Sequence, residues 1–379
     1  MNITKRSALT IFSLGTVASL VGQGKFPSAQ AQTQRAAPSN TAVQENSGIM
    51  QRSDRDMRRV LEKLQQLGAK PIGTQSVEET RKGVTPADAV KAILKDDGKD
   101  PQALMAQMRV KTQDVNYPTA GGTQAARIYT PETPAGPQRP LPVIVYYHGG
   151  GWVIADITTY EASAMALAHK AKAIVVSVEY RHAPEHRFPA AHEDAFNAYK
   201  WVVQNAATWG GDSKRIALAG ESAGGNLAAN VAIMARDQNV QRPVHMLLVY
   251  PVAGTDTNTP SYQRNAEALP LNKAAMAWFV SNTIRNEQDL QSPMLNLVGR
   301  ANLRSLPPAT VITAEIDPLM SEGKMLADKL RQAGNTTTYK NFEGVTHEFF
   351  GMAAVVKDAE RAQDLAAQAL REAFKVRVR

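Results

Sequence analysis

A serine flanked by glycines lies near the middle of the chain, in Gly220-Glu221-Ser222-Ala223-Gly224. This pentapeptide has the pattern GxSxG. A serine hydroxyl is a weak nucleophile, and it becomes reactive when a tight turn between a strand and a helix exposes it beside a base. The turn leaves no space for side chains at its glycines. Residues 216–219 are apolar and residues 226–230 favour a helix, as such a turn requires. We therefore predict that Ser222 is a nucleophile and that the N–H of Ala223 faces the oxygen that becomes negative.

Three consecutive glycines follow another apolar run. Residues 143–147 lead directly into His148-Gly149-Gly150-Gly151-Trp152. Glycines at the end of a buried strand allow the backbone to aim its N–H groups at a reacting oxygen, which predicts an oxyanion hole. A flexible loop is the alternative, although flexibility directly after a buried strand is unusual. A phosphate-binding loop is excluded because no Gly-Lys-Ser/Thr sequence follows.

A reactive serine also needs a base and an acid. In hydrolases with this serine turn, the acid and then the histidine follow the serine along the chain. Of the 7 histidines, His245 and His347 follow Ser222. His245 begins an apolar strand and is predicted to be structural, whereas His347 lies in a loop after the last predicted strand. Asp317 lies at the carboxyl end of a strand, where open α/β sheets bind ligands, and Glu315 is the alternative acid.

A second motif resembles a metal site. Residues 182–186 have the pattern HxxEH found in some zinc proteases. Zinc binding there requires both histidines on one helical face, and Pro184 opposes a helix. The chain contains no cysteine, which excludes disulfides, thiol catalysis and cysteine-ligated zinc. The sequence therefore predicts no metal and no cofactor.

The N-terminal residues are typical of an exported protein. Lys5 and Arg6 precede an apolar run over residues 8–21, and Ala29-Gln30-Ala31 is a small-residue cleavage site. We therefore predict a signal peptide over residues 1–31 and a secreted or periplasmic protein, with the general and twin-arginine routes both open. The run is short for a stable membrane span, and an N-terminal anchor is the alternative. Residues 32–53 are polar without apolar periodicity and are predicted to be a disordered linker.

The remaining chain divides at about residue 110. Apolar residues recur at helical spacing in residues 56–67 and 86–95, the second helix beginning at Thr85-Pro86. We predict that residues 54–109 are a helical cap segment whose apolar faces cover the mouth of the site. They would pack beside an insertion near residues 255–285 that holds Met276, Trp278 and Phe279.

From residue 110 to residue 379, the pattern predicts an α/β domain. Two strands surround the turn at Gly121-Gly122, and near-continuous apolar runs then alternate with helical segments. Such runs are strands buried on both faces, so we predict a mostly parallel sheet flanked by helices. The runs are residues 143–147, 173–178, 216–219, 245–250 and 310–313, and residues 337–342 are predicted to be the last strand.

The net charge of the chain does not indicate a nucleic-acid partner. The formal charge is +8 over 379 residues, but acidic residues are interleaved with the basic ones. A nucleic-acid-binding surface requires basic residues gathered on one face. The sequence leaves the oligomeric state open.

Several motifs together resemble the hormone-sensitive lipase family of α/β-hydrolases, in its bacterial carboxylesterase branch. The resemblance covers residues 110–379 and, more loosely, the helices before them. The matching motifs are HGGGW at 148–152, YRHAPE at 180–185, FPAA at 188–191, GESAGGN at 220–226, DPL at 317–319 and THEF at 346–349.

This resemblance implies an α/β-hydrolase fold with a helical cap and a serine triad. The residues that it implies are Ser222, Asp317 and His347 as the triad, and the N–H groups of Gly150, Gly151 and Ala223 as the oxyanion hole. Two positions depart from the family pattern. Glu221 replaces the usual aspartate, and Glu348 occupies a position that is often glycine. An additional carboxylate beside the histidine is expected to shift its pKa.

The sequence as a whole predicts a serine carboxylesterase that hydrolyses short-chain esters through an acyl-enzyme. The predicted partner is a small-molecule ester. An amidase or a lactonase would use the same triad and remains an alternative. A non-catalytic ligand-binding relative is another alternative, since plant gibberellin receptors resemble this family and have lost the histidine. His347 is retained here, which argues against that alternative.

Overall fold

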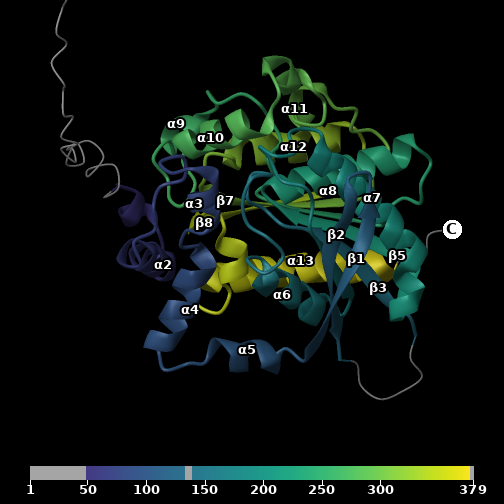
Figure 1. Cartoon of the computed structure of the whole chain (residues 1–379), viewed down its shortest axis with the longest axis horizontal. Coiled ribbons are helices and arrows are strands. Elements are labelled where there is room, and N and C mark those ends of the chain that lie inside the picture. Colours follow the sequence, from purple (N-terminus) through teal and green to yellow (C-terminus); the bar gives the residue numbers. More distant parts are fainter. Residues whose placement is uncertain (1–47, 133–138, 376–379) are drawn as a thin grey trace, which may run out of the picture. The chain divides into compact units, whose positions relative to one another are not determined.

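The apolar runs of the sequence form one 8-stranded, mostly parallel sheet with helices on both faces, as predicted (Figure 1). The computed structural model describes residues 48–132 and 139–375. The predicted signal peptide (1–31) and most of the predicted linker (32–47) lie outside the described residues. The strand order is β1-β2-β4-β3-β5-β6-β7-β8. Strands β1 and β2 form an antiparallel hairpin, β2 pairs antiparallel with β4, and the other neighbours are parallel.

Most strands extend the predicted runs by a few residues, whereas β4 and β6 are one or two residues shorter than predicted. Their bounds are β1 Val110–Thr119, β2 Gly122–Pro131, β3 Leu141–Tyr147, β4 Ile174–Val178, β5 Gly211–Glu221, β6 Met246–Val249, β7 Ala309–Ile316 and β8 Thr337–Thr346. The helices that flank the sheet are α6 Glu161–Ala171, α7 Ala190–Asn205, α8 Ala223–Asp237, α12 Met320–Gln332 and α13 Lys357–Lys375. A short 3-10 helix, η1 Ala206–Trp209, follows α7, and another, η3 Phe349–Met352, follows β8.

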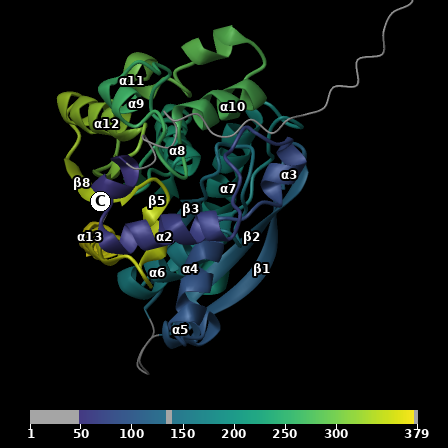
Figure 2. The ribbon, with the colours of Figure 1, turned by 90° about the vertical axis from the view of Figure 1, so that its left-hand side faces the viewer.

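Both faces of the central strands β3, β4, β6 and β7 are buried, which explains their continuous apolar runs, whereas the outer strands β1, β2 and β8 include exposed residues. Alternate residues of one strand belong to different cores, because side chains in a strand point to opposite faces. In β3, Val143 and Val145 pack with α7, α8 and α12, whereas Ile144 and Tyr146 pack with α6 and α13. Figures 1 and 2 show these two helical layers on opposite sides of the sheet.

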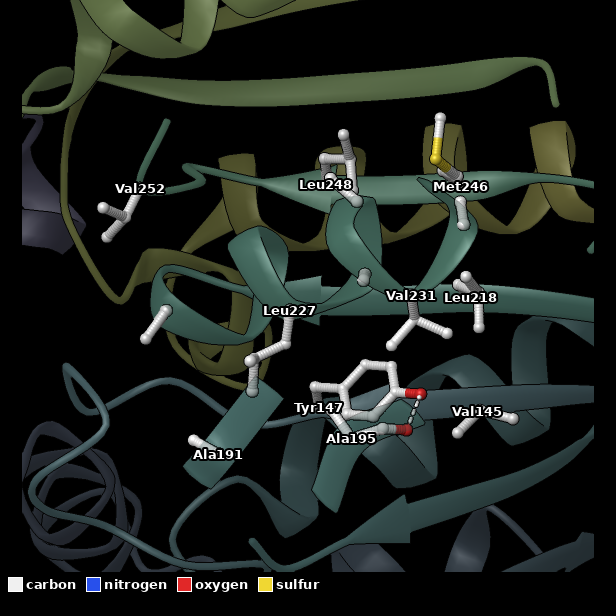
Figure 3. Packing of buried hydrophobic residues seen from close by; sticks show 14 of the residues in the cluster. Val145, Tyr147, Ala191, Ala195, Leu218, Leu227, Val231, Met246, Leu248 and Val252 are labelled. Atoms are coloured by element: carbon white, nitrogen blue, oxygen red, sulfur yellow. Dashed lines mark hydrogen bonds between the residues drawn. The ribbon is translucent and has the colours of Figure 1, made fainter. Parts of the chain in front are cut away.

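Helix α8 lies directly over the central strands. Its Leu227 and Val231 belong to the same buried cluster as Leu218 of β5 and Leu248 of β6, and Val231 lies next to Leu218 in the close-up of Figure 3. At the neighbouring strand β3, the hydroxyl of Tyr147 donates a hydrogen bond of 3.0 Å to the carbonyl of Ala195 in α7. This packing fixes the start of α8 relative to the strand ends, and the predicted nucleophile lies at that start.

The N-terminal part of the described chain corrects one predicted boundary. Residues 48–52 are helical, although the predicted linker extended to residue 53. Ile49 and Ser53 are buried, and the Ser53 hydroxyl donates to the carbonyl of Ile49. The polar composition of the segment concealed this, because one buried isoleucine does not produce an apolar period.

Four helices follow before the sheet begins: α2 Arg55–Gln66, α3 Val77–Arg81, α4 Pro86–Asp96 and α5 Pro101–Gln107. Helix α4 begins at Thr85-Pro86 as predicted, since Thr85 and Asp88 form a reciprocal capping box. The prediction that the apolar faces of these helices cover the mouth of the site is wrong. Met57, Leu61 and Ile93 pack in the core on the α6 and α13 side of the sheet, whereas Met276 and Phe279 belong to the other core.

The predicted insertion near 255–285 lies within a longer connection between β6 and β7. It contains α9 Pro260–Arg264, α10 Lys273–Thr283, the 3-10 helix η2 Glu287–Gln291 and α11 Leu297–Arg300. The loop between α2 and α3 reaches this insertion, because Gly73 lies against the Trp278 side chain. Among the helices of residues 48–132 and 139–375, none has the length and apolar character needed to cross a bilayer.

Candidate active site

Ser222 lies on a tight turn between β5 and α8, as its sequence context predicts. Its backbone has φ 56° and ψ −119°, a conformation that side chains rarely adopt. A Cβ at Gly224 would lie 2.0 Å from the carbonyl oxygen of Tyr147, and a Cβ at Gly220 would lie 2.1 Å from the carbonyl of Gly224. Both glycines are therefore required by close backbone approach. The turn is fixed at the sheet because Ser222 N–H donates to the carbonyl of Val249, at 2.9 Å.

The structure brings the three predicted triad residues into one hydrogen-bonded chain. Ser222 Oγ lies 3.0 Å from His347 Nε2, and His347 Nδ1 lies 2.7 Å from Asp317 Oδ2. A carboxylate can only accept, so Nδ1 carries the proton and Nε2 is free to accept the serine hydroxyl. The other oxygen of Asp317 accepts the N–H of Leu319 at 2.8 Å. The three residues follow β5, β7 and β8, so the carboxyl ends of these strands position them.

The two alternatives for acid and base lie elsewhere. The Glu315 carboxylate pairs with Arg264 at 3.0 Å and accepts the N–H of Gly344 at 3.0 Å. His245 is buried in the sheet, with Nε2 3.0 Å from Thr310 Oγ1. Both residues therefore have structural contacts that account for their positions.

The charges around His347 favour its protonated form. Burial of the imidazole alone would lower its pKa, because it disfavours the charged ring. The negative charge and hydrogen bond of Asp317, with smaller contributions from Glu348 and Glu221, outweigh burial and raise the pKa of His347 above its usual value. This arrangement therefore favours the imidazolium form of His347 over the neutral ring.

The predicted oxyanion-hole residues surround the same serine. Gly150 and Gly151 follow β3 with φ angles of 96° and 59°, and Ala223 is the first residue of α8. Within residues 48–132 and 139–375, no protein acceptor is bonded to the backbone N–H of these three residues. Their donors are thus available to an oxygen beside Ser222, and their role as an oxyanion hole stays a prediction.

Two carboxylates beside the triad stand out in the structure. Glu221 is 1% exposed and accepts hydrogen bonds from Tyr146, at 2.5 Å, and from Tyr250. Burial, with the nearby charge of Glu348, raises the pKa of Glu221 to about 7. Glu348 accepts a hydrogen bond of 2.5 Å from Tyr160, and burial raises its pKa as well. The sequence indicated both glutamates as departures, but it gave no sign of the three tyrosines.

A cavity of about 460 Å³ opens beside Ser222 and His347. Its lining is mainly apolar, and two segments outside the loops at the strand ends contribute to it. The insertion contributes Leu271, Met276 and Phe279, and the chain from the end of α2 to the first residue of α4 contributes Ile72 and Pro86. An apolar cavity of this size beside a serine, a histidine and free N–H donors can hold a small acyl compound.

Arg81 of α3 links this N-terminal segment to the loop after the glycines through hydrogen bonds and an ion pair. Its Nε donates to the carbonyl of Val153 at 2.8 Å, and its guanidinium pairs with Glu185 at 2.7 Å. The carbonyl of Ala183 accepts a further hydrogen bond of 2.9 Å. The segment that lines the cavity is therefore tied directly to the glycine loop.

The HxxEH motif has no helical geometry, in agreement with its rejection as a zinc site. Residues 183–186 form turns, and Glu185 pairs with Arg81. Among the described residues, one group could hold a metal ion: His148, Glu179 and His182, with ligand atoms within 4.8 Å of one another. His148 Nε2 lies 3.3 Å from one oxygen of Glu179, and the other oxygen accepts the N–H of Ile157 at 2.7 Å. These contacts position the loop after the glycines, and the absence of a metal or cofactor stays a prediction.

Comparisons with known proteins agree with this geometry. A family model described as the alpha/beta hydrolase fold matches residues 144–351. Carboxylesterase NlhH of Mycobacterium tuberculosis is 40% identical over 281 residues, which are 73% of this chain and 86% of that protein. Esterase LipI of the same organism is 40% identical over 286 residues, which are 75% and 88% of the two chains.

A solved structure extends the likeness to three dimensions. The esterase of Pyrobaculum calidifontis matches with a TM-score of 0.70 and 35% identity, over 81% of this chain and 96% of that chain. The sheet, the serine turn and the motifs that follow it are thus those of one family. The chain belongs to the alpha/beta-hydrolase fold family, in its hormone-sensitive-lipase-like group.

Proposed function

We propose that this chain is a serine esterase in which Ser222 attacks the ester carbonyl, His347 transfers the proton and Asp317 holds the histidine. The chain is a carboxylic ester hydrolase, like its relatives of 40% identity. One observation carries the serine mechanism. The hydrogen-bonded chain from Ser222 through His347 to Asp317, with distances of 3.0 and 2.7 Å, borders the large apolar cavity.

Each step of the proposed reaction uses a group already in place. As Ser222 Oγ bonds to the carbonyl carbon, His347 Nε2 takes the hydroxyl proton. The carbonyl oxygen becomes negative and accepts the N–H groups of Gly150, Gly151 and Ala223. The imidazolium then gives its proton to the leaving alcohol as the ester C–O bond breaks. Water attacks the acyl-enzyme in the same way, releasing the acid and restoring the serine hydroxyl.

The shape of the cavity supports short acyl chains as substrates. Its volume of about 460 Å³ must hold the acyl group, the ester and the alcohol together. Side chains from the insertion and from the N-terminal segment line it on two sides, so its length is finite. We therefore expect the highest turnover from acetate to roughly hexanoate, and no rate increase when substrate forms an interface.

Replacing Ser222 with alanine tests the mechanism. Ser222→Ala should fold normally and lose ester turnover, because Ser222 is the hydroxyl bonded to the His347 ring among the described residues. Phenylmethylsulfonyl fluoride should modify the wild type once, on the peptide that contains Ser222, as peptide mass spectrometry would detect. Ser177→Ala, which removes a buried serine hydroxyl from β4, is the matched control and should retain both turnover and the label. Full turnover by folded Ser222→Ala would contradict the proposal.

A panel of p-nitrophenyl esters from acetate to palmitate tests the acyl preference, below and above the solubility of each ester. A maximum at palmitate would refute the short-chain proposal while leaving the serine mechanism intact. Matching amides and lactones belong in the same panel, since both would use the same triad. Faster turnover of the amides or of the lactones than of the esters would show that the chain is an amidase or a lactonase.

We also propose export of the protein, from the basic start, the apolar run and Ala29-Gln30-Ala31. The expected mature chain begins at Gln32. Intact-mass measurement of secreted or periplasmic material tests this. Unprocessed chain confined to the cytosol would refute it.

A further inference from the structure

Glu348 has a backbone conformation that disfavours its side chain. Its φ of 71° and ψ of 0° lie in the left-handed region, which glycine enters freely and other residues enter at a cost. Backbone strain of this kind persists mainly at functional sites, where the surrounding structure holds it in place. A glutamate kept in this conformation next to His347 therefore prompts the question of what its carboxylate does.

The carboxylate of Glu348 lies at the cavity, close to Ser222 and His347. Glu348 Oε1 lies 3.8 Å from Nε2 of His347, the nitrogen that also contacts Ser222. The Tyr160 hydroxyl donates to this same oxygen at 2.5 Å and fixes its direction. The Glu348 side chain is 22% exposed and lines the large cavity together with Ser222 and His347. Among the described residues, none donates to its other oxygen, so the carboxylate has acceptor capacity available inside the cavity.

The distance between His347 Nε2 and Glu348 Oε1 allows a single water molecule to form hydrogen bonds with both atoms. A water at an ordinary hydrogen-bond length of about 2.8 Å from both Nε2 and Oε1 would place the two acceptors at an angle of roughly 85°. This angle is small enough for the two hydrogens of a single water to reach both atoms. The lone pairs of that water then point away from both acceptors, toward an acyl group on Ser222.

We propose that Glu348 binds and orients the water that hydrolyses the acyl-enzyme. This inference rests on the serine mechanism proposed above. One hydrogen of the water is donated to His347 Nε2 and the other to Glu348. As the water oxygen bonds to the acyl carbon, Nε2 takes the first proton, while the second stays on the oxygen. The imidazolium returns its proton to Ser222 Oγ when the acyl C–Oγ bond breaks, and the carboxylic acid leaves.

An alcohol provides the discriminating comparison, because its hydroxyl carries one hydrogen. Methanol needs His347 as an acceptor but has no hydrogen for Glu348. Loss of the carboxylate should therefore slow attack by water while leaving attack by methanol nearly unchanged. Acylation by the ester should also be nearly unchanged, because Ser222 contacts His347 directly.

Glu348→Gly is the main variant, since glycine suits the left-handed backbone and the variant should fold. Glu343→Gln, on the exposed side of β8, is the matched control. With p-nitrophenyl acetate, stopped-flow absorbance should show a burst of about one p-nitrophenol per site at nearly the wild-type rate. Steady-state turnover should fall about ten- to a hundredfold, the size expected for a mispositioned reactant. With methanol added, the ratio of methyl acetate to acetate should rise about tenfold over wild type.

A second variant, Tyr160→Phe, removes the hydrogen bond that orients the carboxylate, and it should change the product ratio in the same direction. A Glu348→Gly protein with the wild-type product ratio would overturn the proposal, as would an equal loss of acylation and deacylation. Mass spectrometry of the quenched reaction separates this failure from failure of the serine mechanism. An acetyl group on the Ser222 peptide with an unchanged lifetime refutes the water site alone, whereas full turnover by folded Ser222→Ala refutes the serine mechanism.

Discussion

Replacing Glu221 with glutamine tests how strongly burial opposes ionisation beside the nucleophile. The pKa of Glu221 is raised from 4.5 to about 7, first because the carboxyl is buried and then because of the charge of Glu348. Tyr146 and Tyr250 donate to it and oppose this rise without cancelling it. The folded protein therefore holds this proton at pH values where the unfolded chain has released it.

The sign of the effect on stability follows from proton binding. Between about pH 4.5 and pH 7 the folded state binds more protons at Glu221 than the unfolded state does, so the free energy of unfolding falls as pH rises. The contribution is fully present below pH 4.5 and lost above pH 7. Since one pKa unit corresponds to about 1.4 kcal/mol, the loss across this window is about 3 kcal/mol.

Glu221→Gln keeps the shape and removes the ionisation. Its amide oxygen can accept from Tyr146, and its N–H can donate to the Tyr250 oxygen. The free energy of unfolding of the variant, minus that of wild type, should rise by about 2 to 3 kcal/mol between pH 5 and pH 8. Taking this difference cancels other titrating groups, such as buried Glu322, whose pKa is raised to about 8.

Urea unfolding followed by tryptophan fluorescence, at pH steps from 5 to 8, measures this difference. Glu343→Gln replaces an exposed glutamate and should give a difference that does not depend on pH. A Glu221→Gln difference as flat as this control would refute the reasoning. It would mean that the two tyrosine hydroxyls compensate fully for burial.

Three further predictions concern the triad, the serine turn and the base. Asp317→Asn should lower kcat for p-nitrophenyl acetate about ten-thousandfold, because it changes the tautomer of His347, and a loss below tenfold would contradict that role. Gly224→Ala should prevent stable folding, because its Cβ would lie 2.0 Å from a backbone oxygen of β3, whereas Gly48→Ala, with no atom within 4 Å, should melt like wild type. Glu348→Gln should move the acid limb of the kcat/KM profile to lower pH, because Glu348 is one of the charges that raise the pKa of His347. An unchanged limb would show that this carboxyl is neutral when the histidine titrates.

The sequence predicted which residues come together at this site because each of them follows the end of a strand. A serine turn requires glycines on both sides, and the structure shows the close backbone contacts that make Gly224 necessary. Chain order then selected Asp317 and His347, and the structure places them in hydrogen-bond contact. Residue type, spacing and order were sufficient here because the chemistry constrains all three.

The arrangement of the cap could not be predicted in the same way. Helical periodicity indicated that Met57 and Ile93 are buried, but it does not identify the surface that buries them. That surface is formed by C-terminal elements, including Phe349 and Leu370, which lie about 250 residues or more further along the chain. The segment that connects α2 to α4 reaches the cavity instead, through Ile72, together with Pro86 at the start of α4. Partners this distant leave no local pattern in the sequence.

The tyrosines around the glutamates were missed for another reason. Tyr146 and Tyr250 lie in apolar stretches, where a tyrosine is expected to be an ordinary core residue. Their hydroxyls have meaning only with Glu221, which comes from a different strand. Polar partners inside a core are therefore found from the structure, since hydrophobic patterns record only the apolar part of each side chain.

The two departures from the family pattern become one feature in the structure. Glu221 and Glu348 line the same small cavity, of about 40 Å³, together with Ser163 and Tyr160. This volume is enough for a water molecule, and both acidic groups and both hydroxyls can bond to it. The charge of Glu348 raises the pKa of Glu221, so ionisation of one carboxyl disfavours ionisation of its neighbour. Glu348 also lines the cavity beside Ser222 and His347. A change in the charge of Glu221 therefore changes the tendency of this cavity-lining carboxyl to ionise. Glu221 and Glu348 therefore form one coupled pair of carboxyls beside the triad, which an aspartate and a glycine at these positions would not form.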